Sequence, residues 1–283
     1  MPSTGVPVPV PVPGAVAGLL IERGCAVVGR RSGQRGSPVG HGDRRRATLR
    51  RTAQALRWHT SLRPRGPRLT VDNELQSWRD ARRRELTAAR CAVPAPLRRQ
   101  WNEAIAQQLQ TRFAALQGMV VGGYWPFRSE FDPRFFLHHL RRGGTRTALP
   151  VVVARNAPLQ FRDWWPGAPM RKAALGLPVP EGTEVLTPQA LLIPPLGFDA
   201  HGYRLGYGGG YFDRTLAALP GQTLKIGVAF ELSRMATIRP QWHDIAMDFI
   251  VTELGLYRVS PHGLARVDEA WCLAPGAWCL APA

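Results

Sequence analysis

The sequence predicts an α/β protein, in which a single domain with a mostly parallel sheet flanked by helices follows a disordered N-terminal extension. Between residues 71 and 262, short apolar runs typical of buried strands alternate with amphipathic helical patterns, as in parallel sheets covered by helices. The first 70 residues instead contain eight prolines and ten glycines. Such a segment buries too little apolar surface to offset its ordering entropy. We therefore predict an extension at 1–70, a catalytic domain at 71–262 and a tail at 263–283.

The first two helices are predicted from capping signals and periodicity. A helix over residues 72–90 would be capped by Asp72, and a second would follow Pro94 and Pro96. Apolar residues at steps of four and three give the second helix one buried stripe. The stripe consists of Leu97, Trp101, Ile105, Leu109, Phe113 and Leu116.

Two shorter helices and six strands complete the predicted domain. A helix over residues 132–142 has Asp132 as its cap and Pro133 at its first position, and a short helix covers 210–219. Apolar runs predict the strands. These runs are 119–124, 147–153, 159–164 (in a hairpin), 190–193, 224–230 and 247–253.

The charge of the chain is concentrated in the extension. The net charge is +17, but residues 1–70 hold 13 arginines against Glu22 and Asp43, so the other 213 residues carry +6. Lys172 and Lys225 are the only lysines beside 35 arginines, which indicates a codon bias. We predict no nucleic-acid partner. The alternative, nucleic-acid binding through the extension, would give salt-dependent binding that is lost when the extension is removed.

The cysteines and the apolar runs indicate a protein of a reducing compartment. Cys25, Cys91, Cys272 and Cys279 form no C-x-x-C pair, so free thiols are expected. No apolar run approaches the roughly 20 residues of a membrane helix, and no targeting segment is recognised. We expect a cytoplasmic monomer with no membrane partner. The predicted tail repeats Trp-Cys-Leu-Ala-Pro, to which we assign no function.

The stretch 194–214 carries the strongest functional signal. Its glycines expose main-chain N–H groups and can adopt positive φ, so the loop can direct several N–H groups at one anion. Arg204 and Arg214 flank it with forked donors for phosphate oxygens. The glycines are Gly206, Gly208, Gly209 and Gly210. The dinucleotide and P-loop fingerprints are absent, and an ordinary glycine-rich surface turn is the structural alternative.

Two carboxylates near this loop are candidates for a magnesium site. Asp213 ends the loop, and Asp244 precedes the strand predicted at 247–253. Mg²⁺ is commonly held by one or two protein carboxylates together with phosphates and waters. In the structural alternative, Asp244 caps a turn and Asp248 pairs with an arginine.

Together these motifs resemble a known family. Residues 204–214 (RLGYGGGYFDR), with Phe198-Asp199 upstream and His243-Asp244 downstream, resemble the signature of 5-formyltetrahydrofolate cyclo-ligases, also called methenyltetrahydrofolate synthetases. The resemblance extends in consistent order over residues 75–258. It implies a single α/β domain that closes 5-formyltetrahydrofolate to 5,10-methenyltetrahydrofolate with ATP. In the implied mechanism the formyl oxygen is phosphorylated, N10 attacks, and ADP and phosphate are released.

The resemblance also implies site residues, with ATP and Mg²⁺ as cofactors and reduced folate as substrate. Arg204 and Tyr211 are implied as catalytic, and Asp213 and Asp244 as magnesium ligands. The implied ATP-binding residues are Arg79, Arg83, Arg204, Leu205, Gly206, Tyr207, Gly208, Gly209, Gly210, Tyr211 and Phe212. The implied folate-binding residues are Trp125, Glu130, Tyr207, Gly208, Gly209, Gly210 and Tyr211.

Two positions depart from the family pattern. Arg79 stands where the family has a lysine four residues before Arg83, which keeps the charge on a longer, forked side chain. Val179 stands where many relatives carry glutamate, so that acid is missing or is replaced by a group such as Glu181. The main rival function is a phosphate-ligand enzyme or sugar-phosphate binder that does not hydrolyse ATP. ADP release that depends on 5-formyltetrahydrofolate would separate the two.

Overall fold

The computed structural model describes residues 68–173 and 176–274, so the predicted extension lies almost wholly outside the described residues, as do Cys25 and Cys279. The helices are α1 (Arg68–Ala92), α2 (Ala95–Arg112), α3 (Arg134–Arg142) and α4 (Tyr211–Ala218), with 3-10 turns η1 (Ala114–Leu116) and η3 (Glu231–Ser233). The strands are β1 (Val120–Gly122), β2 (Arg146–Val151), β3 (Gln160–Asp163), β4 (Met170–Lys172), β5 (Pro178–Pro180), β6 (Val185–Leu186), β7 (Ala190–Ile193), β8 (Gly197–Phe198), β9 (Arg204–Leu205), β10 (Leu224–Val228), β11 (Phe249–Thr252), β12 (Gly255–Ser260) and β13 (Gly263–Arg266).

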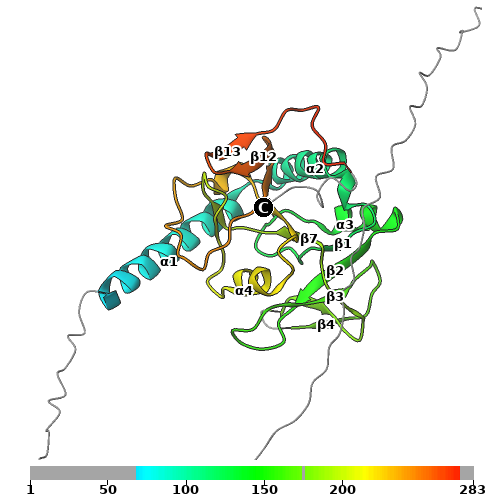
Figure 1. The fold of residues 1–283 in the computed structure, drawn as a ribbon, viewed down its shortest axis with the longest axis horizontal. Helices are drawn as coiled ribbons and strands as arrows, with labels where there is room; N and C mark the ends of the chain where they lie inside the picture. The colour runs from blue at the N-terminus through cyan, green and yellow to red at the C-terminus, as the bar shows by residue number, and fades with distance from the viewer. Residues whose placement is uncertain (1–67, 174–175, 275–283) are drawn as a thin grey trace, which may run out of the picture. The chain divides into compact units, whose positions relative to one another are not determined.

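A twisted sheet of nine strands forms the centre of the described part (Figure 1). Its order is β13-β12-β11-β10-β7-β1-β2-β3-β6. The five middle strands, from β11 to β2, pair in parallel, and the flanking strands pair antiparallel. The predicted α/β class with a mostly parallel central sheet is therefore confirmed. Two further pairs, β4-β5 and β8-β9, lie outside this sheet.

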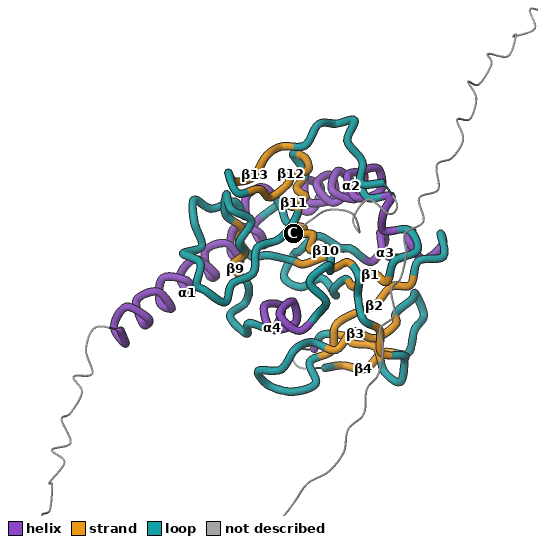
Figure 2. Tube along the Cα trace, in the orientation of Figure 1, coloured by secondary structure: helices purple, strands orange, loops and turns teal. Residues whose placement is uncertain are grey.

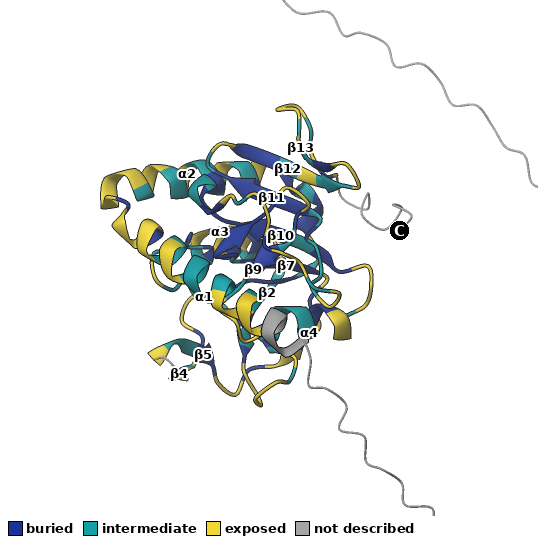
Figure 3. Ribbon diagram, turned by 90° about the vertical axis from the view of Figure 1, so that its left-hand side faces the viewer, coloured by how far each residue is buried: buried dark blue, intermediate teal, exposed yellow. Residues whose placement is uncertain are grey.

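Both faces of the sheet are covered, so its middle strand β7 is apolar throughout. In β7, Ala190 and Leu192 pack in one core cluster with residues of α2 and α3, whereas Leu191 and Ile193 pack with Leu216 of α4 in another. Successive side chains of a strand point to opposite faces, so a run without polar residues fits a strand buried on both sides. The buried strands lie between more exposed helices and loops (Figures 2 and 3).

Two helix caps differ from the sequence prediction. Helix α1 begins at Arg68, so the prediction of Asp72 as its cap is wrong; residues 68–71 contain neither glycine nor proline to stop the helix. Helix α3 begins one residue late, with Pro133 as the N-cap residue. Asp132 still accepts a hydrogen bond from the Arg134 N–H at 3.1 Å, so its carboxylate serves that first turn.

The sheet extends past residue 262, where the tail was expected to begin. Strand β13 pairs antiparallel with β12, and Leu273 packs in the main core cluster. The buried guanidinium of Arg112 donates to the carbonyl oxygens of Asp268 and Trp271 at 2.5 and 3.4 Å. Within the described residues, Cys91 and Cys272 are free thiols, and no helix there has the length and apolarity to cross a bilayer.

Candidate active site

Two loops leave the carboxyl edge of the sheet side by side. Strands β1 and β7 are parallel neighbours, with Val121 opposite Ala190. From β1 the chain continues to β2, on one side of the β1-β7 pair. From β7 it continues to β10, on the other side of this pair. Open α/β sheets bind their ligands at such a switch point. The segment after β1 leads to Glu130 and the segment after β7 leads to the glycine loop, so the topology brings both predicted regions to one edge.

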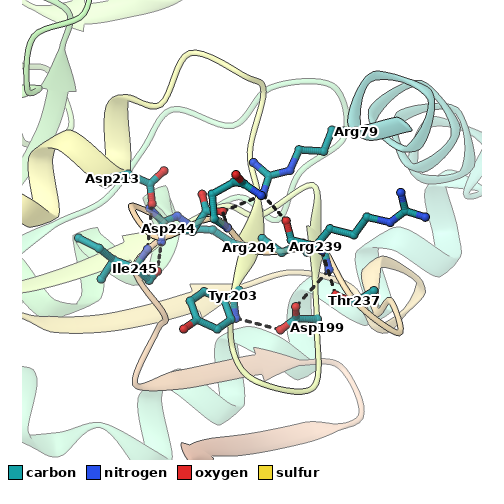
Figure 4. A network of polar contacts seen from close by, with 11 residues as sticks. Arg79, Asp199, Tyr203, Arg204, Asp213, Thr237, Arg239, Asp244 and Ile245 are labelled. Atoms are coloured by element: carbon teal, nitrogen blue, oxygen red, sulfur yellow. Dashed lines mark hydrogen bonds and ion pairs between the residues drawn. The ribbon is translucent and has the colours of Figure 1, made fainter. Parts of the chain in front are cut away.

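A buried carboxylate fixes the β8-β9 hairpin that presents the glycine loop. Asp199 is 1% exposed, and its Oδ1 accepts hydrogen bonds from the N–H groups of His201 at 3.0 Å and Tyr203 at 3.1 Å. Its Oδ2 accepts the Ile238 N–H at 3.1 Å. Asp199 therefore ties the hairpin to the loop that leads to Asp244, as Figure 4 shows.

Arg204 is the buried cation at the end of this hairpin. It is 7% exposed, and it donates to Asp213 Oδ1 and to the carbonyl oxygen of Ile245, both at 2.6 Å. Burial lowers the pKa of Arg204, and the charges of Asp213 and Asp244 oppose that shift. These contacts hold the start of α4 and the segment around Ile245 against the hairpin (Figure 4).

Helix α1 supplies a second arginine–carboxylate pair. Arg79 donates to Asp244 Oδ2 at 2.7 Å and to the carbonyl oxygen of Arg239 at 2.8 Å. The same Oδ2 accepts the Gln241 N–H at 2.7 Å, so Asp244 also closes a turn, as the structural alternative expected. Asp248 pairs with Lys225 at 3.0 Å, not with an arginine as that alternative predicted.

Three of the four loop glycines are favoured by the local geometry. Gly208 has φ +95° and Gly210, the cap residue of α4, has φ +60°, values that disfavour other residues. A Cβ on Gly209 would lie 2.8 Å from the Tyr211 ring. Arg83 Nε donates to the Gly206 carbonyl oxygen at 2.8 Å, which anchors the loop to α1.

The two arginine–carboxylate pairs and the glycines line one cavity of about 660 Å³. Its lining residues are Gln76, Arg79, Arg83, Asn156, Arg204, Leu205, Gly206, Gly208, Gly209, Gly210, Asp213, Arg214, Ala217, Trp242, His243 and Asp244. The structure thus brings together most of the residues that the resemblance implied for ATP. Three others have different surroundings: Tyr207 bonds to Glu130, the Tyr211 ring lies 5.2 Å from the Arg214 guanidinium, and Phe212 packs beside Leu216.

Asp213 and Asp244 fit a magnesium ion that also binds phosphate. Both line the cavity, and in the described contacts Asp213 accepts through Oδ1 and Asp244 through Oδ2. The second oxygen of each carboxylate is left for a cation. Among the described residues, no group of three or more acidic, histidine or cysteine side chains forms a metal cluster. Two carboxylates suit Mg²⁺ when phosphates and waters complete its coordination.

Glu130 is buried beside this cavity and contacts the glycine loop. It is 7% exposed; Oε1 accepts the Tyr207 O–H at 2.8 Å, and Oε2 accepts the Phe127 N–H at 2.9 Å. Burial raises the pKa of Glu130 from 4.5 to about 7, while the charge of Arg90 and these two hydrogen bonds oppose the shift. Burial, together with the charge of Glu130, also raises the pKa of Tyr207.

The remaining predicted folate residue, Trp125, is half-buried near Glu130 in sequence. Its ring packs against the main core cluster, and the Arg134 guanidinium lies 4.4 Å from the ring centroid. Val179, at the position of the missing acid, is buried in β5. Glu181 lies 3.9 Å from Arg171 at the edge of the β4-β5 pair, so the described contacts give it a local partner.

Several residues at the site were missed by the sequence reasoning. Arg90 contacts Glu130 and Tyr207 and was hidden within the arginine-rich α1. Gln76 and Asn156 line the cavity, and no motif marked them. Trp242 also lines the cavity and is 95% exposed. The available signal in the sequence was its position directly before His243-Asp244.

The described part of the chain thus has an α/β fold and a cavity lined by arginines, carboxylates and glycines. The family model described as the 5-formyltetrahydrofolate cyclo-ligase family matches residues 75–253. The 5-formyltetrahydrofolate cyclo-ligase of Mycolicibacterium smegmatis is 32% identical over 181 residues, which cover 60% of this chain and 91% of the relative. The enzyme of that name from Escherichia coli K12 is 30% identical over 161 residues, covering 53% and 88%.

A solved structure shares the fold. The 5,10-methenyltetrahydrofolate synthetase of Aquifex aeolicus matches with a TM-score of 0.55 and 23% identity, covering 68% of this chain and 97% of that one. The chain belongs to the 5-formyltetrahydrofolate cyclo-ligase family, and the resemblance drawn from the sequence is confirmed. It is therefore a ligase of a family that converts 5-formyltetrahydrofolate to the methenyl form with ATP.

Proposed function

We propose that this chain cyclises 5-formyltetrahydrofolate to 5,10-methenyltetrahydrofolate and releases ADP and phosphate. One observation carries the proposal: a single loop both lines the cavity and contacts the buried Glu130. Its Arg204 and Asp213 line the cavity, whereas its Tyr207 bonds to the buried Glu130 of the neighbouring loop. A loop in this position can set a triphosphate next to a reduced pterin.

The cavity side of the loop is suited to ATP phosphates. Its glycine N–H groups and the N-terminus of α4 favour an anion, and Arg79, Arg83 and Arg204 add positive charge. Asp213 and Asp244 would hold Mg²⁺, which neutralises charge on the phosphates. Phosphoryl transfer depends mainly on such positioning and charge neutralisation.

The chemistry requires an activated formyl oxygen, because the N5 formyl group is an amide and its oxygen is a poor leaving group. Transfer of the γ-phosphoryl group to that oxygen breaks the bond to ADP and forms a phosphate ester. N10 then attacks the formyl carbon and forms the new C–N bond. The C–O bond breaks, phosphate leaves with the bonding electrons, and the N10 proton is lost to solvent. Arg204 would stabilise the charge on the transferred group.

On the folate side, Glu130 would accept hydrogen bonds from N–H groups of the pterin, and Trp125 and Tyr211 would provide aromatic faces. Glu130 is suited to this role because it is buried, so a hydrogen bond to its carboxylate competes with little water. Its present donors, Tyr207 O–H and Phe127 N–H, occupy one acceptor position on each oxygen, and the second position on each would be left for ligand donors.

The test measures absorbance of the methenyl product and ADP release, with each substrate omitted in turn. We expect product only when both substrates are present, and at least a hundredfold lower kcat in Arg204→Gln, about the loss of one preorganised donor. Arg112→Gln is the matched control, because Arg112 is also 7% exposed and donates to backbone carbonyls away from the cavity. A wild-type protein without folate-dependent ADP release would leave the rival, a phosphate-ligand protein that does not hydrolyse ATP.

A further inference from the structure

Arg90, near the end of α1, connects three segments of the site. It is 3% exposed, and its Nη2 donates to the Tyr207 hydroxyl at 2.8 Å and lies 3.5 Å from Glu130 Oε1. Its Nε donates to the carbonyl oxygen of Arg128 at 3.0 Å. One buried guanidinium thus contacts the glycine loop, the buried carboxylate and the backbone of the turn that carries this carboxylate.

That turn has an unfavourable backbone conformation. Arg128 and Ser129, directly before Glu130, have φ values of +48° and +61°. Non-glycine residues adopt this region at an energetic cost and keep it where the surrounding structure holds them. Arg90 supplies such support, since its Nη2 also donates to the Phe127 carbonyl oxygen at 3.5 Å.

We propose that Arg90 is a positioning residue for the folate site, which holds the turn and keeps Glu130 an anionic hydrogen-bond acceptor aimed at the pterin. The inference rests on the proposed function. It goes further because it assigns a role to a residue of α1 outside the glycine loop and the arginine pair of the ATP cavity.

The electrostatics around Glu130 agree with this role. Arg90 faces it from α1 and favours its charged form. Tyr207 faces it from the glycine loop, and Tyr124 and Asp132 lie on its own segment. Burial and the charge of Glu130 raise the pKa of Tyr124, whose hydroxyl donates to the Phe131 carbonyl. Asp132 is paired with Arg134 at 2.6 Å. Among the described contacts, Arg90 is thus the cation that offsets the burial of Glu130.

The experiment follows kcat/KM for 5-formyltetrahydrofolate against pH in Arg90→Gln. In the wild type we expect kcat/KM to fall as the pH drops through about 7, because only the ionised Glu130 binds substrate; this decline is the acid limb of the profile. Without the positive charge of Arg90, the carboxyl group holds its proton to higher pH, so the limb moves in the alkaline direction. At pH 7 we expect kcat/KM for the folate to fall about tenfold or more, because a protonated Glu130 no longer gives the pterin a charge-assisted hydrogen bond. The value should recover partly above pH 8. The KM for ATP should change much less.

Three variants separate positioning from a merely structural role. Arg90→Lys keeps the charge and should keep the limb close to its wild-type position. Arg98→Gln removes an arginine that lies 3.4 Å from Ser129 Oγ of the same turn, and should leave the limb in place. In the Glu130→Gln background the titrating carboxyl group is absent, so adding Arg90→Gln should leave the pH profile of kcat/KM unchanged.

An unmoved limb in Arg90→Gln, or a loss that is equal at every pH, would overturn the inference while leaving the cyclisation proposal intact. If the wild type fails to cyclise folate, the proposed function falls. The ¹³C carboxyl titration of Glu130 in Arg90→Gln and Arg90→Lys then still decides whether Arg90 controls its charge. Should Arg90→Gln not fold, Arg90→Met, which keeps the aliphatic part of the side chain and removes its charge, gives the same comparison with Arg90→Lys.

Discussion

Replacing Asp199 by asparagine removes one acceptor and leaves the shape of the side chain unchanged. The amide oxygen can still accept from His201 and Tyr203, but the amide NH₂ then faces the Ile238 N–H, so two donors oppose each other. Ile238 is fully buried, and water cannot replace the lost acceptor. A buried unsatisfied N–H costs about 1–3 kcal/mol, and the loss of charge on the two remaining bonds adds to this.

We therefore expect Asp199→Asn to lower the free energy of unfolding by about 2–3 kcal/mol. For a domain of this size, that corresponds to a melting temperature lower by about 4–12 °C. The loop after Ile238 also carries Arg239 and Asp244, which bind Arg79, so the KM for ATP should rise. Calorimetry and steady-state kinetics at a temperature where the variant is folded measure the two effects separately.

The control for this prediction is Asp268→Asn. Asp268 is exposed, and its Oδ1 accepts one N–H, from Ala270 at 2.8 Å, a bond that asparagine can keep. Its melting temperature should stay within about 1 °C of the wild type. The reasoning about Asp199 would be refuted if Asp199→Asn were as stable as this control with an unchanged KM for ATP.

Three further predictions follow from the same structure. Gly210→Ala should cost about 1–2 kcal/mol and raise the KM for ATP, because φ is +60° there, whereas Gly221→Ala, in open space, should be close to neutral in both measurements. Since burial raises the pKa of Glu130 from 4.5 to about 7, the folded state holds a proton that the unfolded chain has released; stability should fall as pH rises through this window, and urea unfolding of Glu130→Gln should lack that decline. A chain starting at residue 68 should keep cyclisation activity, and a salt-sensitive nucleic-acid affinity in the full chain that vanishes on this truncation would favour the alternative function instead.

Elements fixed by local patterns were predictable from the sequence. Strand β7 was predicted at its observed bounds, because four consecutive apolar residues before two prolines fit a strand buried on both faces. The glycine loop was predicted because positive φ favours glycine, and Gly208 and Gly210 show that requirement. Strands β12 and β13 were missed, because their mixed polar pattern depends on antiparallel pairing at the sheet edge.

Contacts between distant segments could not be predicted by the same means. Arg90 and Tyr207 are 117 positions apart, and α1 offers several arginines with the same local environment in sequence. Only the folded structure distinguishes Arg90, buried against Glu130, from Arg84, which is exposed on the same helix. Arg79 was implied by the family resemblance, at the family's spacing from Arg83, and the structure adds its partner Asp244, which the resemblance did not supply.

In the proposed function, Tyr207 would link the two substrates through one loop. Gly206, the residue before it, is bonded through its carbonyl to Arg83 on the ATP side, whereas the Tyr207 hydroxyl is bonded to Glu130 on the folate side. A pterin that bonds to Oε1 of Glu130 would displace this hydroxyl or share the oxygen with it, whereas the Phe127 N–H occupies one acceptor position of Oε2. The Gly206 carbonyl and the Tyr207 nitrogen belong to one planar peptide unit. Movement of the Tyr207 backbone would therefore also move the carbonyl oxygen that Arg83 contacts. Binding of folate and binding of ATP should therefore be energetically coupled, and the coupling must be equal when measured from either ligand.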